Sequence, residues 1–163
     1  MKEPTSVGLG EQAISSNPED ILVAYGLGSC VGVIMIDPVS KVSGLLHAVL
    51  PKATDGFKDS SYKPSKFVES GIEQLLADLI HKGAMKSRLI VHLVGGANML
   101  MLSGVGSFDI GNRNLEAAYA VLNRLNMQVT SAEVGGHLGR TVRIYVADGR
   151  VTIRSAGQKE HSI

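Results

Sequence analysis

Residues 25–51, YGLGSCVGVIMIDPVSKVSGLLHAVLP, show the pattern of a complete β-hairpin. The run 31–36 is continuously apolar, which is typical of a buried strand. Asp37 to Lys41 combines Asp, Pro and Ser, residue types that favour a tight turn. The apolar-rich segment 42–50 then serves as the antiparallel partner and ends at Pro51. We therefore predict two adjacent strands, with a Gly-rich turn at the entrance to the first.

Helical periodicity appears twice further along the chain. A helix is expected to begin near Ser65, which follows Pro64 and can cap the free backbone N–H groups, and to stop near Gly83. Its apolar stripe is Phe67, Val68, Ile72, Leu75, Leu76, Leu79 and Ile80. A second helix over about 112–126 is expected to bury Leu115, Ala118, Tyr119, Leu122 and Leu125.

Hairpins outnumber strand–helix–strand units in the remaining pattern. Further strands are expected over residues 6–14, 21–25, 88–94, 128–134, 141–146 and 150–155. Asp148-Gly149 is a two-residue hairpin signal between the last two of these strands. The pattern favours an α+β fold with mixed, largely antiparallel sheets layered with two main helices. No linker divides the chain, so residues 1–163 are expected to form a single domain.

Composition excludes several functional classes. The formal net charge is +1 and the basic residues are dispersed, which does not support nucleic-acid or membrane-surface binding. The longest apolar stretch, 21–36, is interrupted by glycines and is too short for a spanning helix, so no membrane insertion is expected. Glu3 and Pro4 stand where a signal peptide would begin its apolar core. The single cysteine fits a reducing compartment, and we expect a cytoplasmic protein.

The residues offer little for a metal or an organic cofactor. The histidines are scattered, with no pair at metal-ligand spacing and no second cysteine, so no metal site is predicted. The Gly-x-Gly pieces lack the strand-to-helix context of a dinucleotide site, and the Gly-Lys-Ser/Thr phosphate loop is missing from the sequence. We therefore expect no cofactor.

A Cys–His pair is the remaining catalytic combination. Cys30 and His47 are 17 residues apart on opposite sides of the predicted hairpin turn, which would bring them close together. An adjacent imidazole can activate a thiol, and backbone N–H groups near Gly28 and Ser29 can stabilise an oxyanion. A lone cysteine in an apolar run is, however, more often a buried structural thiol. From the residues alone, both interpretations stay open.

Several stretches, taken in order, resemble the CheD family of chemoreceptor glutamine deamidases. They are GLGSCVGV, HAVLP, KPSKFVESGI, VGGANM, IGNRN and EVGGHLGR, and together they span nearly the whole chain. The resemblance implies the CheD-like α+β fold, which is related to the cysteine deamidase toxins. It also implies hydrolysis of receptor glutamine side chains to glutamate, with Cys30 as nucleophile and His47 as base.

The sequence departs from the family pattern at the third catalytic position. The family typically has a threonine six residues before the cysteine, where this chain has Ala24. A backbone carbonyl, Ser29 or the hydroxyl of Tyr25 are candidates to replace it. Milder departures occur at Phe67, Glu69 and Glu133.

The resemblance also implies partners: the cytoplasmic helices of chemoreceptors as substrate, and a CheC-type phosphatase. A candidate docking surface is the loop 95–106, which includes Gly95, Gly96, Asn98, Met99 and Leu100. For Asn112, Arg113 and Arg140 we expect structural support. Two other functions remain as alternatives: a catalytically weakened CheD-like binding module in chemotaxis signalling, and a cytosolic α+β protein whose cysteine is inert.

Overall fold

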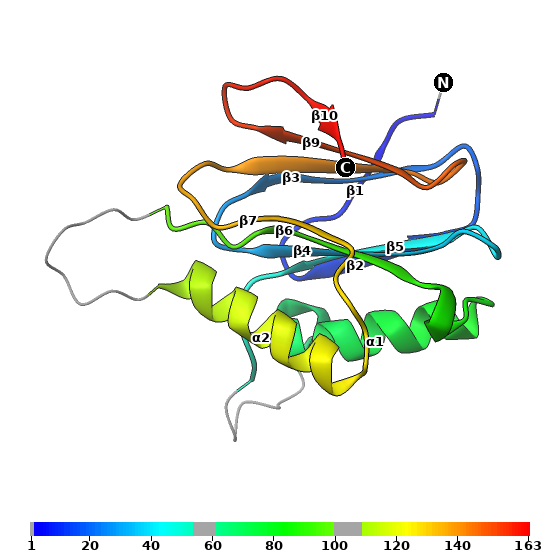
Figure 1. Cartoon of the computed structure of the whole chain (residues 1–163), viewed down its shortest axis with the longest axis horizontal. Helices are drawn as coiled ribbons and strands as arrows, with labels where there is room; N and C mark the ends of the chain where they lie inside the picture. The colour runs from blue at the N-terminus through cyan, green and yellow to red at the C-terminus, as the bar shows by residue number, and fades with distance from the viewer. Residues whose placement is uncertain (1, 54–60, 100–108) are drawn as a thin grey trace, which may run out of the picture.

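The computed structural model describes residues 2–53, 61–99 and 109–163, and within them the chain forms three layers (Figure 1). One five-stranded sheet, here called sheet A, has the strand order β1 (Thr5–Ser6), β3 (Ile21–Leu27), β8 (Arg140–Tyr145), β9 (Arg150–Ser155) and β10 (His161–Ser162). The second, sheet B, has the order β2 (Glu11–Ser15), β5 (Val42–Ala48), β4 (Val31–Asp37), β6 (Ile90–Gly95) and β7 (Ser131–Val134).

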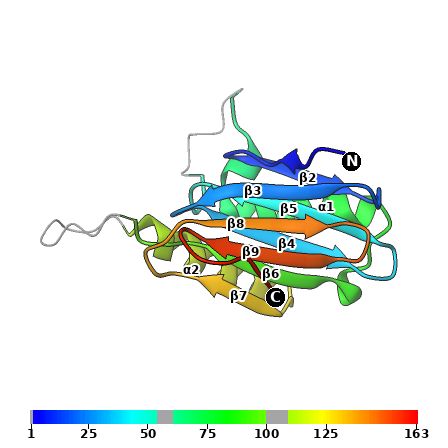
Figure 2. The same cartoon turned by 90° about the horizontal axis from the view of Figure 1, so that it is seen from above.

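The third layer consists of the helices α1 (Val68–His81) and α2 (Ile110–Arg124), which cover the face of sheet B that is turned away from sheet A. Short 3-10 turns at Pro64–Lys66 and Lys86–Arg88 precede α1 and β6. Seen from above, sheet A lies on top of sheet B (Figure 2). Only β1–β3 and β6–β7 are parallel among the described strand pairs. The fold is α+β with mixed, largely antiparallel sheets, so the predicted fold class is confirmed.

The central hairpin also agrees with the prediction. Strands β4 and β5 pair antiparallel, with Val31 opposite Ala48 and Asp37 opposite Val42. Alternate residues of both strands point to opposite faces. Val33 and Leu46 pack with the helices, whereas Ile34 and Leu45 pack between the two sheets. Sheet B is therefore buried on both faces, which explains why its hairpin reads as a continuous apolar run.

Some predicted elements were wrong in detail. The expected strand 6–14 is two strands in different sheets, because the chain turns at Gly10 (φ +72°) and crosses from sheet A to sheet B. Ser65 is not the cap of α1: its hydroxyl donates to the Gly10 carbonyl, and Phe67 occupies the N-cap position without a side-chain bond. The hairpin at Asp148-Gly149 has a longer loop, since Tyr145 pairs with Arg150.

Two side chains assigned to buried helix faces are exposed instead. Ile80 near the end of α1 is 47% exposed, and Tyr119 in α2 is 43% exposed. Both lie beside the stripe of buried residues on their helix, not within it. The stop at Gly83 is confirmed, because Gly83 has φ +106° and its N–H bonds to the carbonyl of Ile80.

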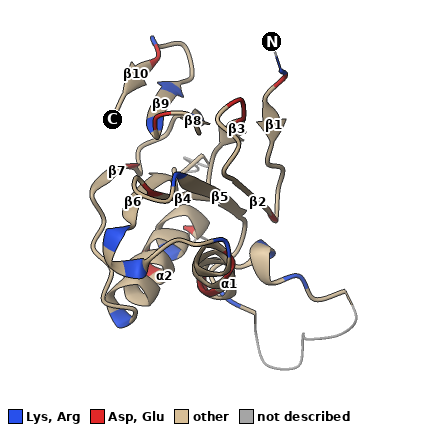
Figure 3. Cartoon of the chain, turned by 90° about the vertical axis from the view of Figure 1, so that its right-hand side faces the viewer, with Lys and Arg blue, Asp and Glu red and all other residues tan. Residues whose placement is uncertain are grey.

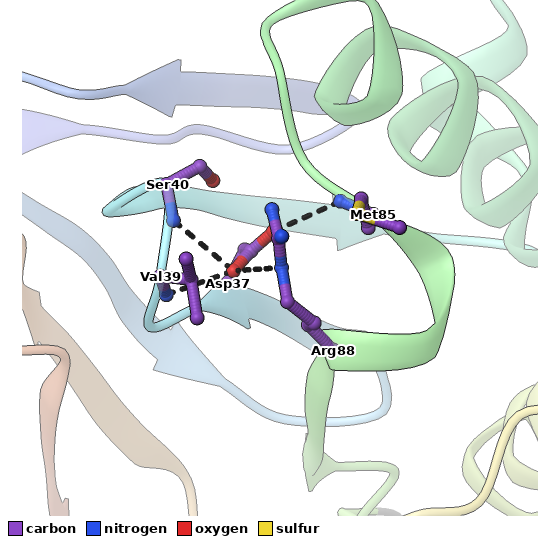
Figure 4. A network of polar contacts seen from close by, with 5 residues as sticks. All are labelled: Asp37, Val39, Ser40, Met85 and Arg88. Atoms are coloured by element: carbon purple, nitrogen blue, oxygen red, sulfur yellow. Dashed lines mark hydrogen bonds and ion pairs between the residues drawn. The ribbon is translucent and has the colours of Figure 1, made fainter.

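A buried ionic network stabilises the turn between β4 and β5 (Figure 4). The Asp37 side chain is fully buried and accepts hydrogen bonds from the backbone N–H groups of Val39, Ser40 and Met85. Arg88 adds a bidentate contact, with Nη2 at 2.8 Å. Burial by itself would raise the pKa of Asp37, but these bonds together hold the pKa well below its usual range. The network joins the hairpin turn to the segment that enters β6.

Charges do not gather on one face. In the view of Figure 3, basic and acidic residues occur on strands, helices and loops alike. Among the helices that the structure describes, none has the length and apolar character needed to cross a membrane.

Candidate active site

Cys30 lies at the end of the Gly-rich turn, one residue before β4 begins. Its residue exposure is 8%, and it belongs to the apolar cluster between the two sheets, together with Ala24 and Leu27. Burial raises the pKa of the Cys30 thiol, while its own backbone N–H, close to the sulfur, acts in the opposite direction. The thiol is therefore neutral near pH 7 unless a base takes its proton.

His47 is held near Cys30 by the register of the hairpin. Gly32 lies directly opposite His47, and Cys30 is two residues before Gly32, on the same face of the sheet. Cys30 and His47 are thus diagonal neighbours that both face the layer between the sheets. Because Gly32 has no side chain, Leu27 occupies the space next to it, with Cδ1 3.0 Å from where a Cβ would stand.

The two ring nitrogens of His47 have different surroundings. Nδ1 lies 2.9 Å from the carbonyl oxygen of Val7, which can only accept a hydrogen bond. The proton of the neutral ring must therefore sit on Nδ1 for this bond to form. Nε2 is buried and has no hydrogen-bond partner in the described part of the chain. The nitrogen with the free lone pair is the one that can accept a proton.

Ala24 lies next to the group that holds the ring. It is fully buried in β3 and contributes to the cluster between the sheets. Ser6 pairs in parallel with Val23, and the Val7 N–H bonds to the Val23 carbonyl, so Val7 and Ala24 lie side by side. The hydrogen bond to Nδ1 of His47 thus comes from the backbone of the segment that lies beside Ala24.

The Gly95-Gly96 turn lies directly against the cysteine turn. The N–H of Gly96 donates to the Cys30 carbonyl and the N–H of Ala97 donates to the Gly28 carbonyl, each at 2.8 Å. Both glycines have positive φ, and a Cβ on Gly95 would stand 2.3 Å from the Cys30 oxygen. Only glycine allows this approach. Both turns belong to motifs that resemble the CheD family, GLGSCVGV and VGGANM, but the sequence did not predict that the two turns contact each other.

The candidate docking residues continue from this contact. The Asn98 N–H bonds to the Gly136 carbonyl, and the Asn98 carbonyl lies 3.0 Å from Nδ1 of His137. Met99 is 51% exposed, and its Cγ lies 3.1 Å from where a Cβ on Gly28 would be. Leu100 and the rest of the predicted loop, to residue 106, lie outside the described residues.

The other candidates are placed in different surroundings. Tyr25 is 50% exposed and its ring lies beside Arg143, away from the layer that holds Cys30. Arg140 donates to the Gly135 carbonyl at 2.9 Å and approaches the Gly95 carbonyl at 3.4 Å, so it connects β8 with the glycine turns. Asn112 is exposed and contacts Glu116 at 3.3 Å.

Two contacts near the site were not predicted. One is the identity of the carbonyl that holds His47: a backbone carbonyl was among the candidates, but no sequence signal points to Val7 because every residue carries a carbonyl. The other is Asn114 of α2, which is fully buried and donates to the carbonyls of Ser29 at 2.9 Å and Val49 at 3.0 Å. A signal was present here: Asn114 stands four residues before Ala118, on the apolar stripe of the helix, where a polar residue needs a partner.

Comparison with known proteins now decides the family. Residues 49–155 match the family described as CheD chemotactic sensory transduction. A protein of Symbiobacterium thermophilum named "Probable chemoreceptor glutamine deamidase CheD" is 40% identical over 97% of this chain and 96% of its own length. The chain belongs to the CheD family. The family match begins after Cys30 and His47, whereas the relative covers both positions.

Two further relatives carry the same family name. A probable chemoreceptor glutamine deamidase CheD of Pyrococcus abyssi is 38% identical over 94% of this chain and 93% of its own length. A second such protein, "CheD 2" of Anaeromyxobacter dehalogenans, is 35% identical over 94% of the chain and 95% of its own length. The names of these relatives refer to chemoreceptors as the substrate of a glutamine deamidase.

Proposed function

We propose that this CheD-family chain hydrolyses glutamine side chains of chemoreceptors to glutamate, with Cys30 as nucleophile and His47 as acid and base. The relatives carry the name of this activity. The observation that carries the mechanism is the state of the His47 ring: Nδ1 is tied to the Val7 carbonyl, and Nε2 has no partner on the face that also bears Cys30. A neutral thiol beside such a base forms a nucleophile by proton transfer.

The reaction begins with transfer of the Cys30 proton to Nε2 of His47. The thiolate attacks the carboxamide carbon, and the Cys30 N–H, near its own sulfur, stabilises the oxyanion with the neighbouring turn. The imidazolium then gives its proton to the leaving nitrogen, ammonia departs and a thioester remains. His47 takes a proton from water and the hydroxide attacks the thioester. The imidazolium then returns this proton to the departing Cys30 sulfur, and glutamate and the Cys30 thiol are released. One water is consumed and one ammonia is formed.

The substrate is a helical cytoplasmic segment of a chemoreceptor, which places the reaction in the cytoplasm. Asn98 and the exposed Met99 are the expected docking residues beside the cysteine turn. Gly95 and Gly96 are buried and support this surface from below, because the Gly96 N–H donates to the Cys30 carbonyl. A CheC-type phosphatase is the expected regulatory partner.

Deamidation of a glutamine-bearing receptor fragment tests this proposal. The wild-type chain should release ammonia and raise the mass of the fragment by about one dalton per site, while Cys30→Ser should do neither. Binding of the fragment, measured in parallel, should be equal for both proteins.

A second function has one observation in its favour, the alanine at position 24. A chain that has lost turnover would act as a binding module for the receptor or the phosphatase. If wild type and Cys30→Ser bind the fragment equally and neither releases ammonia, the binding module replaces the enzyme.

A further inference from the structure

We infer that Asn114 is a positioning residue for the Cys30 nucleophile, acting through the peptide bond between Ser29 and Cys30. The inference rests on the proposed function, in which Cys30 attacks the substrate. Asn114 is the fifth residue of α2 and is fully buried. It reaches across the layers to two backbone carbonyls, one beside each proposed catalytic residue.

The orientation of the Asn114 amide follows from its partners. The carbonyls of Ser29 and Val49 can only accept, so the amide nitrogen must face both of them and uses both of its N–H groups. The amide oxygen consequently points elsewhere, where it is buried with no hydrogen-bond partner in the described chain. A buried acceptor without a donor opposes folding. Both N–H groups of the amide are thus used on the two carbonyls.

The Ser29 carbonyl belongs to the same planar peptide unit as the Cys30 N–H. In a trans peptide the two bonds point in opposite directions, so fixing the carbonyl toward α2 directs the Cys30 N–H away from α2. That N–H lies near the Cys30 sulfur. A donor on the carbonyl also polarises the peptide and strengthens its N–H as a donor.

The second bond connects the same amide to the strand that bears the base. Val49 is two residues after His47, just beyond the end of β5. The two hydrogen bonds of Asn114 thus tie the start of β4 to the end of β5 at the open end of the hairpin. The Asp37 network closes the opposite end. Asn114 thereby sets the position of Cys30 relative to His47.

The test compares Asn114→Leu with wild type, because leucine has a similar volume and neither donor. Asn112→Ala, on the exposed face of the same helix, is the matched control. Since Cys30 is the only cysteine, alkylation by iodoacetamide reports on it alone. The pH at which the alkylation rate reaches half of its maximum should rise by about one unit in Asn114→Leu and stay unchanged in Asn112→Ala.

Turnover on a glutamine-bearing receptor fragment gives a second readout. Asn114→Leu should lower kcat at least about tenfold and leave KM within about twofold, because the substrate surface is intact. If Asn114→Leu unfolds, Asn114→Ser, which is too short to reach both carbonyls, replaces it. A folded variant with the wild-type pH midpoint and kcat overturns the inference, as does unfolding of both variants, which would assign Asn114 to folding alone.

The two proposals fail in distinguishable ways. If wild type releases no ammonia, the deamidase proposal fails, while the alkylation midpoint still decides the role of Asn114. If wild type is active and Asn114→Leu matches it in both readouts, only the role of Asn114 is rejected.

Discussion

The Nδ1 atom of His47 lies 2.9 Å from the carbonyl oxygen of Val7, so the ring is held by the backbone of the segment next to Ala24. Ala24 has no polar side-chain group that could hold the ring. The ring has a defined tautomer without any contribution from residue 24.

We therefore expect Ala24→Thr to change turnover by less than about tenfold, far below the roughly 10⁴-fold that loss of an orienting group can cost. Ala24 is fully buried, so the larger side chain should lower the free energy of unfolding by about 1–3 kcal/mol. Ammonia release and urea unfolding measure the two effects. Ala24→Val, with the same shape and no hydroxyl, is the control. A gain in turnover of more than about tenfold that is confined to threonine would contradict this expectation.

His47→Asn separates orientation from proton transfer. Asparagine can keep a donor near the position of Nδ1, facing Val7, but has no basic nitrogen. We expect kcat to fall by about 10²–10⁴-fold while the protein stays folded. His92→Asn replaces another buried strand histidine of sheet B and should retain activity. Equal activity of both variants would remove His47 from the mechanism.

Gly95→Ala tests the contact between the glycine turn and Cys30. A Cβ at this position would stand 2.3 Å from the Cys30 oxygen, so the turn must shift. Gly157 also has positive φ (+76°), but no atom lies within 4 Å of its Cβ position. Gly157→Ala should cost only about 1–2 kcal/mol of unfolding free energy and no activity. Gly95→Ala should cost more and also lower kcat, and identical behaviour of the two variants would argue against the contact.

Removal of Arg88 should destabilise the fold far more than removal of a surface arginine. Arg88→Ala leaves the fully buried Asp37 carboxylate without its ion-pair partner, and we expect a loss of about 3 kcal/mol. Arg124→Ala breaks an exposed pair with Glu73 and should cost less than about 1 kcal/mol. Urea unfolding at pH 7 compares the two variants. Similar losses would mean that the backbone N–H groups alone satisfy Asp37.

The same network predicts an acid-dependent stability. The pKa of Asp37 is lowered in the folded state, so its contribution is fully present above the unfolded carboxyl pKa of about 4 and is lost as pH falls below it. The free energy of unfolding should therefore decrease between pH 5 and pH 2–3, and Asp37→Asn should lose less over this interval. If the free energy of unfolding falls equally steeply with pH in Asp37→Asn, other carboxyl groups cause the effect.

The sequence by itself determined the elements whose signals are local. The apolar run 31–36, the turn at Asp37 and the partner strand predicted the β4–β5 hairpin, and thereby the proximity of Cys30 and His47 along one face. The helical stripe and Gly83 predicted most of α1 in the same way. These signals can be recognised in the sequence because periodicity and turn chemistry depend on residues that are close together along the chain.

Only the tertiary structure decided how the site is held. The Val7 carbonyl on His47, the Gly96 N–H on the Cys30 carbonyl and the Asn114 amide on Ser29 all join segments far apart in the sequence. All three use at least one backbone group, and backbone groups are alike in every residue and leave no trace in composition. Their partners are chosen by the packing of the sheets and α2, so the chain must be folded before they can be identified.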